Sequence, residues 1–570
     1  MAPELMQTEA VATETPIRST SHAQWWCCFT VMVFTVLVSG CYQMVNGDIW
    51  WHLRAGDWIL DNGTVPRRNL FTYTNPDTVW IDLHWIFQVV VAVIYREFGT
   101  AGLVVWKSVV GAVALGAVFF TAFKRVSGVL FAFAWLPFVW IYAGRFHVRP
   151  EMLSHLYLGV TLLIIHSHHH GRSRVIWLLI PIQVAWVNSQ GLFILQHCVL
   201  GAYALNEQFR DFSKARLNRV WYVLVACSIA TLCNPYGLQG AIFPLELLQK
   251  VGGENREFFQ LLAGETMGMG NFLEDYGIDG ILRSNTPRLM MLTVPLCLGV
   301  VLLGSRRRLS LTIYRWILLF GFGYLAWNMN RNASLYAIVW GYVFVSTLGE
   351  LIGTKSVPKS SDDPALALIR GTITKIGTLF VVVSLLASVT DLLGNKEMPG
   401  GHYPPRRAGF GEDGWYHHEA VRFIAEMPGV ENVYVHYNGT GLAGVVIYHA
   451  FRREVTSSKR VFADARLEAN SPEVLRHFLE ALGENDQTLA RFEGVLSEYG
   501  LNKMALVFKN NDLIIRKRLL EELIASEKWR SVYLSMDPNK GEGVTIFVSQ
   551  DVVEKHQLKI VSVGELRSRF

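Results

Sequence analysis

Residues 101–123 read AGLVVWKSVVGAVALGAVFFTAF, a long apolar run whose single charged side chain is Lys107. An uninterrupted apolar run of about 20 residues is long enough to cross the hydrocarbon core of a bilayer as a helix. Lipid offers no partners for backbone polar groups, so such a segment must satisfy its hydrogen bonds internally. This stretch therefore predicts a membrane-spanning helix, and the rest of the chain can be assigned outward from it.

Ten further segments share this apolar character and the scarcity of charge. They lie at 25–45, 127–144, 151–167, 175–187, 191–207, 218–233, 287–304, 312–328, 333–351 and 371–393. The whole chain is 51% hydrophobic and only 17% charged, whereas soluble domains carry about 25% charged residues. The pattern predicts a polytopic α-helical membrane domain with about eleven spans, residues 25–394, after a short tail, residues 1–24.

Basic residues in the short loops predict the side of the membrane that each loop faces. Loops rich in lysine and arginine stay on the cytoplasmic side. The basic loops alternate consistently only if one ambiguous segment, 83–98, lies along the interface instead of crossing. We therefore expect an integral membrane protein with residues 1–24 cytoplasmic. These charges are topology signals, so we expect no nucleic-acid partner.

Residues 395–570 have a different pattern from the segments before them. Short apolar runs such as NVYVHY (432–437) and VTIFVSQ (544–550) are typical of strands, and they alternate with amphipathic stretches. One such stretch begins with Ser471 as a plausible helix N-cap. The sequence predicts a small soluble α/β domain on the extracytoplasmic side, without internal disulfides because it contains no cysteine.

The first outer loop begins NGDIWWHLRAGDWILDNGTVPRRNLFTYT, residues 46–74. Asp48 follows the first span directly, and His52 and Arg54 continue on what we expect to be a helix. An acid at the bilayer surface beside a basic group can bind a divalent cation such as Mg²⁺ or Mn²⁺, or accept a proton. The alternative is an interfacial amphipathic helix with ordinary solvated charges.

The run DIWWHLRAG, followed by VPRRNLFTYT and WIDLHW, resembles a family of uncharacterised bacterial membrane proteins with a D-x-W-W-H-L start. Matching runs extend the resemblance over nearly the whole chain, at 149–154, 186–191, 233–237, 329–334 and 461–466. That family in turn resembles the GT-C superfamily of polyprenyl-phosphate-sugar-dependent glycosyltransferases, including oligosaccharyltransferases and aminoarabinose transferases. This chain departs from the family at Ser189-Gln190, where Leu-His is usual, and at Ala463 and Ala465, where Ile and Gly are usual.

The resemblance implies a GT-C-like fold with interfacial helices in a bacterial inner membrane. It also implies transfer of a sugar from a polyprenyl-phosphate-linked donor to a cell-envelope acceptor. It makes Asp48 the candidate catalytic base and metal ligand, and Glu151 the candidate second acid. Candidate substrate-binding residues are His52, Arg54, Arg145, Arg149, Arg331 and Asn188.

Each candidate also has an ordinary structural interpretation. Glu151 follows Pro150, where a helix N-terminus favours an acid. The arginines at outer ends of spans can contact lipid headgroups, and Asn188 can form hydrogen bonds between helices. We expect Asp464 and Arg466 to form a structural ion pair, and the histidines around His168 to form a solvated loop.

Two other classes of function remain open at the level of the sequence. A non-catalytic envelope scaffold or lipid-binding protein with the same fold is the main alternative, since the second outer loop lacks an aspartate. A transporter is a third class, which is disfavoured because the sequence shows no inverted repeat. The donor sugar, the acceptor and the oligomeric state are not specified by any motif.

The topology can be tested with reporter fusions. Fusions after Arg125, Arg174, Arg219 and Arg308 should report the cytoplasm, because each follows a basic loop. Fusions after Asp279 and within residues 395–570 should report the outer side. A cytoplasmic reporter signal from residues 395–570 would contradict both the eleven-span topology and the placement of segment 83–98 along the interface.

Overall fold

The computed structural model describes residues 22–353 and 407–570. The gaps within these ranges are 124, 211–213, 252–266, 413–415, 437–440, 452–457, 465, 467–468, 484–485 and 536–542, and five isolated positions between 375 and 386 are also described. The eleventh predicted span, 371–393, therefore lies almost entirely outside the described residues.

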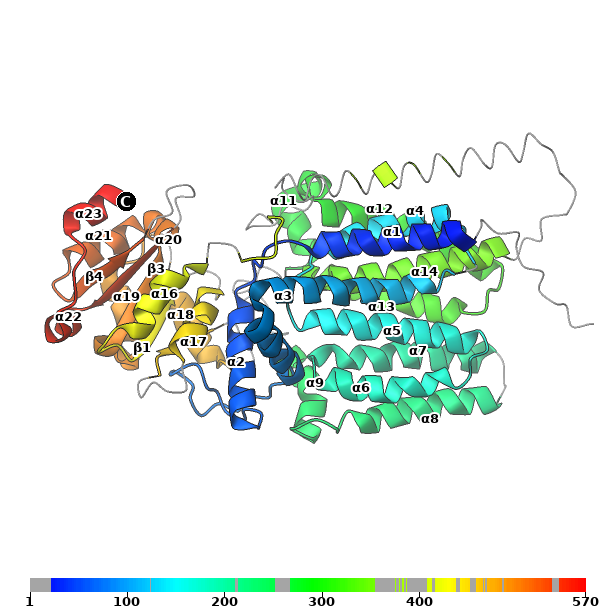
Figure 1. The fold of residues 1–570 in the computed structure, drawn as a ribbon, viewed down its shortest axis with the longest axis horizontal. Coiled ribbons are helices and arrows are strands. Elements are labelled where there is room, and N and C mark those ends of the chain that lie inside the picture. The colour runs from blue at the N-terminus through cyan, green and yellow to red at the C-terminus, as the bar shows by residue number, and fades with distance from the viewer. Residues whose placement is uncertain are drawn as a thin grey trace, which may run out of the picture.

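A bundle of helices that run side by side forms the larger part of the molecule (Figure 1). Each of the other ten predicted spans coincides with one of its helices. The bundle consists of α1 (His22–Gly40), α3 (Trp85–Phe120), α4 (Gly128–Ala143), α5 (Glu151–His169), η1 (Val175–Leu178), α6 (Leu179–Val187), η2 (Gly191–Phe193), α7 (Ile194–Arg210), α8 (Lys214–Ala230), α12 (Asn285–Arg306), α13 (Thr312–Asn328) and α14 (Ala333–Gly353). By length and composition, four of the described helices are long and apolar enough to cross a membrane: α1, α3, α12 and α14.

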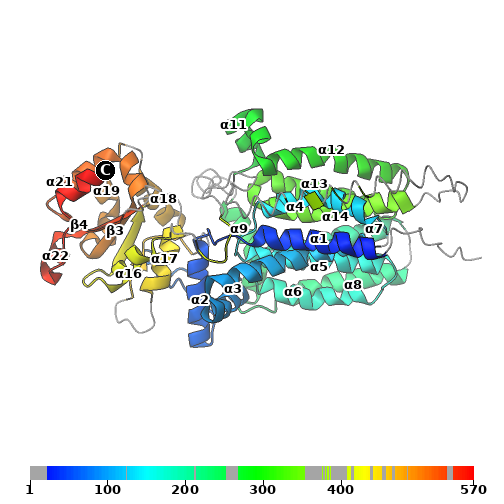
Figure 2. The same ribbon diagram turned by 45° about the horizontal axis from the view of Figure 1, so that its top comes forward.

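The predicted interfacial segments lie across one end of this bundle. Helix α2 (Asp48–Asn62) lies across the direction of the bundle helices (Figures 1 and 2). Helix α3 breaks at Gly99, which adopts a φ of 59°, and its first part lies beside α2. The two pack without side chains between them at Gly56, where any Cβ would collide with the Gln88 carbonyl. Segment 83–98 is thus set off from the rest of α3 by the break at Gly99, and its placement along the membrane interface stays a prediction.

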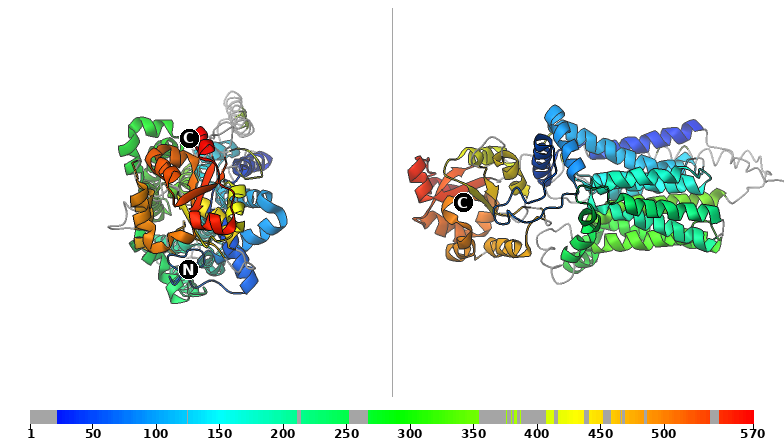
Figure 3. Two further views of the ribbon diagram at one scale, coloured as in Figure 1. Left: turned by 90° about the vertical axis from the view of Figure 1, so that its left-hand side faces the viewer. Right: turned by 90° about the horizontal axis from the view of Figure 1, so that it is seen from below.

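Residues 407–570 form an α/β domain beyond α2, at the same end of the bundle (Figures 1 and 3). Its five-stranded sheet has the order β2-β1-β3-β5-β4, with β1 parallel to β2 and β3, and β5 antiparallel to β3 and β4. The strands are β1 (Asn432–His436), β2 (Arg460–Val461), β3 (Met504–Lys509), β4 (Trp529–Leu534) and β5 (Val544–Ser549). The predicted strands 432–437 and 544–550 are therefore confirmed.

Helices cover both faces of the sheet. Buried side chains of α16 (His418–Glu426), α17 (Gly441–Ala450) and α22 (Gln550–His556) belong to the core on one face. Those of α18 (Pro472–Leu482), α19 (Leu489–Leu496), α20 (Asn510–Ile515) and α21 (Lys517–Ala525) belong to the core on the other. Ser471 caps α18 as predicted, because its side chain accepts a hydrogen bond from the Val474 backbone N–H.

The α/β domain and the membrane-facing helices share one hydrophobic core. The cluster that contains Val433 and Val446 of the α/β domain continues through Trp50 of α2 and Phe87 of α3 to Met152 of α5. Burial of apolar area is the main favourable term in folding. The α/β domain therefore uses residues of α2 and of the chain that follows it as part of its own core.

The structure corrects one prediction, that the histidines around His168 form a solvated loop. Helix α5 continues through this cluster, and His166 and His168 are buried. The His168 Nδ1 lies 3.0 Å from the hydroxyl of Tyr203 on α7, and the His169 Nδ1 lies 3.6 Å from a Glu207 carboxylate oxygen. The prediction is wrong because the helix does not end before the histidines, so neighbouring helices bury them.

Candidate functional site

Asp48 and Arg149, two of the predicted site residues, form an ion pair at the end of the bundle that faces the α/β domain. Asp48 is the first residue of α2, and Arg149 lies in the short connection between α4 and α5. The Arg149 Nη2 is 2.7 Å from the Asp48 Oδ2, and both side chains are about one-fifth exposed. The same Nη2 donates to the Asn46 side-chain oxygen at 3.4 Å. The fold thus joins residues about one hundred positions apart in the sequence.

Arg145 and Glu151, two further predicted residues, form a second ion pair in the same connection. The Arg145 Nη2 lies 3.4 Å from the Glu151 Oε1, and Arg145 is buried. Glu151 is the first residue of α5, after Pro150. Its position at a helix N-terminus agrees with the electrostatic interpretation of this acid, while its pairing with Arg145 keeps it beside the Asp48–Arg149 pair.

A buried lysine, Lys107, lines a small cavity together with Asn46, the partner of Arg149, and it was not among the predicted site residues. Its side chain is 1% exposed. The ammonium lies 3.5 Å from the centroid of the Tyr42 ring and donates to the Tyr42 carbonyl at 3.3 Å. His147 lines the same cavity. The indication in the sequence was the single charge within the run 101–123.

His52 is buried on α2, between the bundle and the α/β domain. Its ring packs against Phe87, and the Gln88 side-chain amide lies 3.5 Å from its Nδ1. Burial, reinforced by the positive electrostatic influence of His84, Arg149 and Arg466, holds the pKa of His52 well below its ordinary value. His52 is therefore a neutral group that borders the Asp48–Arg149 pair.

The structure places Arg54 away from Asp48. Its guanidinium lies over the ring of Phe451 of the α/β domain, and 4.0 Å separates it from an Asp57 oxygen. Asp57 in turn forms a 2.6 Å ion pair with Arg96. Arg54 therefore contributes to the contact between α2 and the α/β domain, and substrate binding by Arg54 stays a prediction that this geometry does not favour.

Asn188 lies at the end of α6, where its amide joins three chain segments. It accepts a hydrogen bond from the Trp85 indole at 2.9 Å and donates to the carbonyls of Val184 and Cys233. These contacts agree with the structural interpretation of Asn188. The residue nevertheless lines a hollow of about 540 Å³ whose other walls are largely apolar, among them Ile86.

Arg331 occupies the short turn η5 (Asn330–Asn332) between α13 and α14. The backbone there is tied to the connection before α11 (Met269–Arg283), because the Asn330 N–H donates to the Met267 carbonyl at 3.0 Å. Contact of Arg331 with a lipid-linked substrate stays a prediction.

The donor set around Asp48 fits a divalent cation poorly. Among the described residues, no three His, Cys, Asp or Glu side chains gather as a metal site. The Asp48 carboxylate faces Arg149, and Glu151 faces Arg145. Divalent cations such as Mg²⁺ and Ca²⁺ prefer several oxygen ligands, and two neighbouring guanidinium groups repel them. Metal binding by Asp48 stays an untested prediction, from which we derive no chemical step.

From the sequence we expected no Gly-x-Gly-x-x-Gly run after a strand of the α/β domain, and that expectation is wrong. The run GTGLAG, residues 439–444, has the spacing Gly-x-Gly-x-x-Gly, typical of dinucleotide-binding turns. Here Gly441 and Gly444, on α17, face the backbone of Gly47. A Cβ on Gly444 would lie 2.6 Å from the Gly47 carbonyl oxygen. These two glycines thus allow the α/β domain to approach the residue next to Asp48.

No family model and no curated protein matches the chain. Solved structures do match. The chain is similar to the archaeal oligosaccharyltransferase AglB from Archaeoglobus fulgidus in complex with an inhibitory peptide and a dolichol-phosphate, with a TM-score of 0.53 and 11% identity over 92% of this chain and 74% of that one. It is similar to the apo oligosaccharyltransferase from the same organism, with a TM-score of 0.52 and 12% identity over 91% and 74%.

A further match, ArnT from Cupriavidus metallidurans bound to undecaprenyl phosphate, has a TM-score of 0.48 and 12% identity over 93% of this chain and 99% of that one. At such low identity, the likeness to the two oligosaccharyltransferase structures shows the fold alone. It confirms the GT-C-like fold of an integral membrane protein, whereas the count of eleven spans stays a prediction.

The lowered pKa of His52 predicts a loss of stability in acid. His52 in the unfolded chain takes up a proton near pH 6.5, whereas the buried ring in the folded protein stays neutral to lower pH. The contribution of His52 to the free energy of unfolding is therefore complete above pH 6.5 and is lost as the pH falls below it. The loss is at most about 1.4 kcal/mol per pH unit. The melting temperature of purified protein should fall between pH 7 and pH 5, and His52→Gln should reduce this fall.

Asn62→Ala is the control for this measurement, because Asn62 lies at the exposed end of the same helix, donates to the Trp58 carbonyl at 2.7 Å and carries no titratable group. It should keep the wild-type dependence on pH. Equal slopes for wild type and His52→Gln would contradict the assignment.

Proposed function

We propose that this protein is a membrane glycosyltransferase that moves a sugar from a polyprenyl-phosphate-linked donor to an acceptor in the cell envelope. The observation that supports the proposal is the Asp48–Arg149 ion pair at the outer end of a GT-C-like bundle. The related AglB structure holds a dolichol-phosphate, so lipid-linked phosphate is the ligand class that we carry over. The proposed location is an inner membrane, with the α/β domain outside.

The charges at the site suit an anionic leaving group. Arg145 and Arg149 supply two guanidinium groups, which pair with the carboxylates of Glu151 and Asp48. These guanidinium groups attract an incoming phosphate. An arginine can hold it through the planar fork of its guanidinium, and partial burial strengthens this attraction. Arg149 therefore binds the donor phosphate next to the carboxylate that it orients.

The reaction is a direct displacement at the anomeric carbon. The acceptor's hydroxyl or amine attacks this carbon while the bond from the carbon to the phosphate oxygen breaks. The electron pair of that bond leaves with the phosphate, whose charge Arg149 and Arg145 stabilise. Asp48 accepts the proton that the acceptor loses. His52, which is neutral, borders this charge cluster without adding to it.

Replacing Asp48 should abolish most activity. Asp48→Asn preserves size and hydrogen bonding but removes the base, and loss of a general base costs about 10²–10⁴-fold in rate. The assay follows consumption of polyprenyl-phosphate sugars by purified protein. Asp61→Asn is the matched control on the same helix, because Asp61 lies 3.8 Å from Arg96 and does not join the Asp48 cluster.

Two outcomes would contradict parts of this proposal. Full turnover by Asp48→Asn, together with inactivity of Arg149→Ala, would move the catalytic role away from Asp48. A wild-type protein that neither consumes nor binds any lipid-linked donor would support the non-catalytic scaffold instead.

The unfavourable donor set predicts that catalysis needs no divalent cation. Treatment with EDTA should leave the rate of sugar transfer unchanged, and Mg²⁺ or Mn²⁺ should not raise the melting temperature. Metal content measured on the purified protein provides a second readout. Loss of activity in EDTA that Mn²⁺ restores would contradict this expectation and support the sequence-based prediction that Asp48 is a metal ligand.

A further inference from the structure

Arg466 and Asp464 form an ion pair inside the α/β domain, and both are almost fully buried. The Arg466 Nη2 lies 2.6 Å from the Asp464 Oδ2, and its Nε lies within 3.1 Å of both carboxylate oxygens. The Asn470 side chain donates to the same carboxylate. Burying such a pair costs free energy of folding unless further hydrogen bonds satisfy both groups. The other contacts of Arg466 therefore indicate its structural role.

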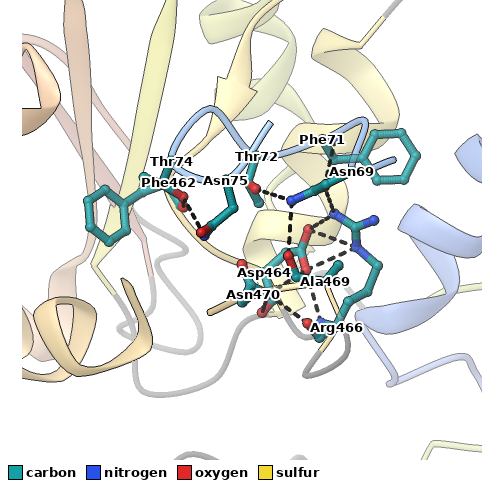
Figure 4. Close-up of polar contacts among 10 residues, drawn as sticks. All are labelled: Asn69, Phe71, Thr72, Thr74, Asn75, Phe462, Asp464, Arg466, Ala469 and Asn470. Carbon is teal, nitrogen blue, oxygen red and sulfur yellow. Dashed lines mark hydrogen bonds and ion pairs between the residues drawn. The ribbon is translucent and has the colours of Figure 1, made fainter. Parts of the chain in front are cut away.

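Those surroundings are supplied by the first outer loop (Figure 4). The Arg466 Nη2 also donates to the Asn69 side-chain oxygen at 2.8 Å, and the Asn69 amide donates to the Ala469 carbonyl at 3.1 Å. The rings of Trp80 and Phe71 lie 4.4 and 4.7 Å from the guanidinium carbon. A planar cation stacked on rings and bonded through its fork is a role that lysine cannot fill.

The same loop extends the sheet. The Val461 N–H at the end of β2 donates to the Phe71 carbonyl at 2.9 Å, and the Tyr73 N–H donates to the Val461 carbonyl at 3.2 Å. The Thr74 hydroxyl donates to the Phe462 carbonyl at 2.7 Å. The outer loop therefore covers the edge strand of the sheet, which would otherwise expose unpaired backbone groups.

These contacts extend to α2. The Trp51 ring on α2 lies 5.8 Å from the Arg466 guanidinium and 6.4 Å from the Trp80 ring. On the other side of Asp48, the backbone of Gly47 meets that of Gly441. The chain is thus attached to the α/β domain both before and after the candidate base.

We propose that Arg466 is a positioning residue for Asp48. With Asp464 it clamps the first outer loop to the sheet, and the clamped loop holds α2 in the orientation that places the Asp48 carboxylate beside Arg149. This inference rests on the proposed function for its effect on catalysis, whereas its effect on α2 is independent of any substrate.

The experiment compares Arg466→Lys and Asn69→Ala with wild type in the purified full chain. Asn69→Ala removes the hydrogen bonds between the loop and Arg466 but leaves the Arg466–Asp464 ion pair intact. This variant therefore still tests the proposal if Arg466→Lys fails to fold. Arg518→Lys is the matched control, because Arg518 forms an exposed ion pair with Glu522 at 3.0 Å. Hydrogen exchange is measured on peptides that cover 48–62 and 66–82, alongside kinetics with a polyprenyl-phosphate sugar.

Both clamp variants should exchange faster in 48–62 and 66–82, with exchange in the bundle unchanged. The kcat should fall about 10- to 100-fold, since small misplacements of reacting groups have costs of this order, while KM for the donor changes less than twofold. Arg518→Lys should match wild type in every measurement.

Unchanged exchange in 48–62 in both variants would overturn the proposal, as would faster exchange with unchanged kcat. If wild type consumes no lipid-linked donor, the proposed function fails, and the exchange data alone decide whether Arg466 positions α2.

Discussion

The structure depends on a constraint at α2, where three backbones meet without side chains between them. Gly56 faces the Gln88 carbonyl of α3, and Gly47 faces Gly441 and Gly444 of α17. Any larger residue at these points would push the elements apart. Backbone atoms are in direct contact at these points, and backbone cannot repack as side chains can. The contacts therefore fix how the end of the bundle, α2 and the α/β domain are placed relative to one another. Asp48 stands at the junction of all three.

Much of this fold could be predicted from composition and periodicity, since ten apolar runs became helices and strands 432–437 and 544–550 became β1 and β5. The break at Gly99 was also consistent with the prediction, because charge alternation required segment 83–98 to lie apart from the spans. The buried histidines of α5 could not be predicted, since helix length alone does not show that neighbouring helices will cover polar side chains.

For the candidate site too, the residues could be predicted from the sequence, but their contacts could not. Local sequence singled out Asp48, Arg149, Arg145 and Glu151, but it could not show which acid pairs with which arginine, because pairing depends on how α2 and α5 approach. Arg54 had the right chemistry and spacing, yet helix geometry turns it toward Phe451. Arg466 was predicted to form a structural ion pair with Asp464. Its contact with Asn69 could not be predicted, because the two residues are 397 positions apart in the sequence.

That separation has a consequence for biogenesis. At a synthesis rate of about 5–20 residues per second, the loop around Asn69 waits roughly 20–80 s before Arg466 leaves the ribosome. During this time the loop has no sheet edge to join, and Trp80 has no guanidinium to stack on. The region around Asp48 therefore acquires its final shape last, after the helices of the bundle have been synthesised.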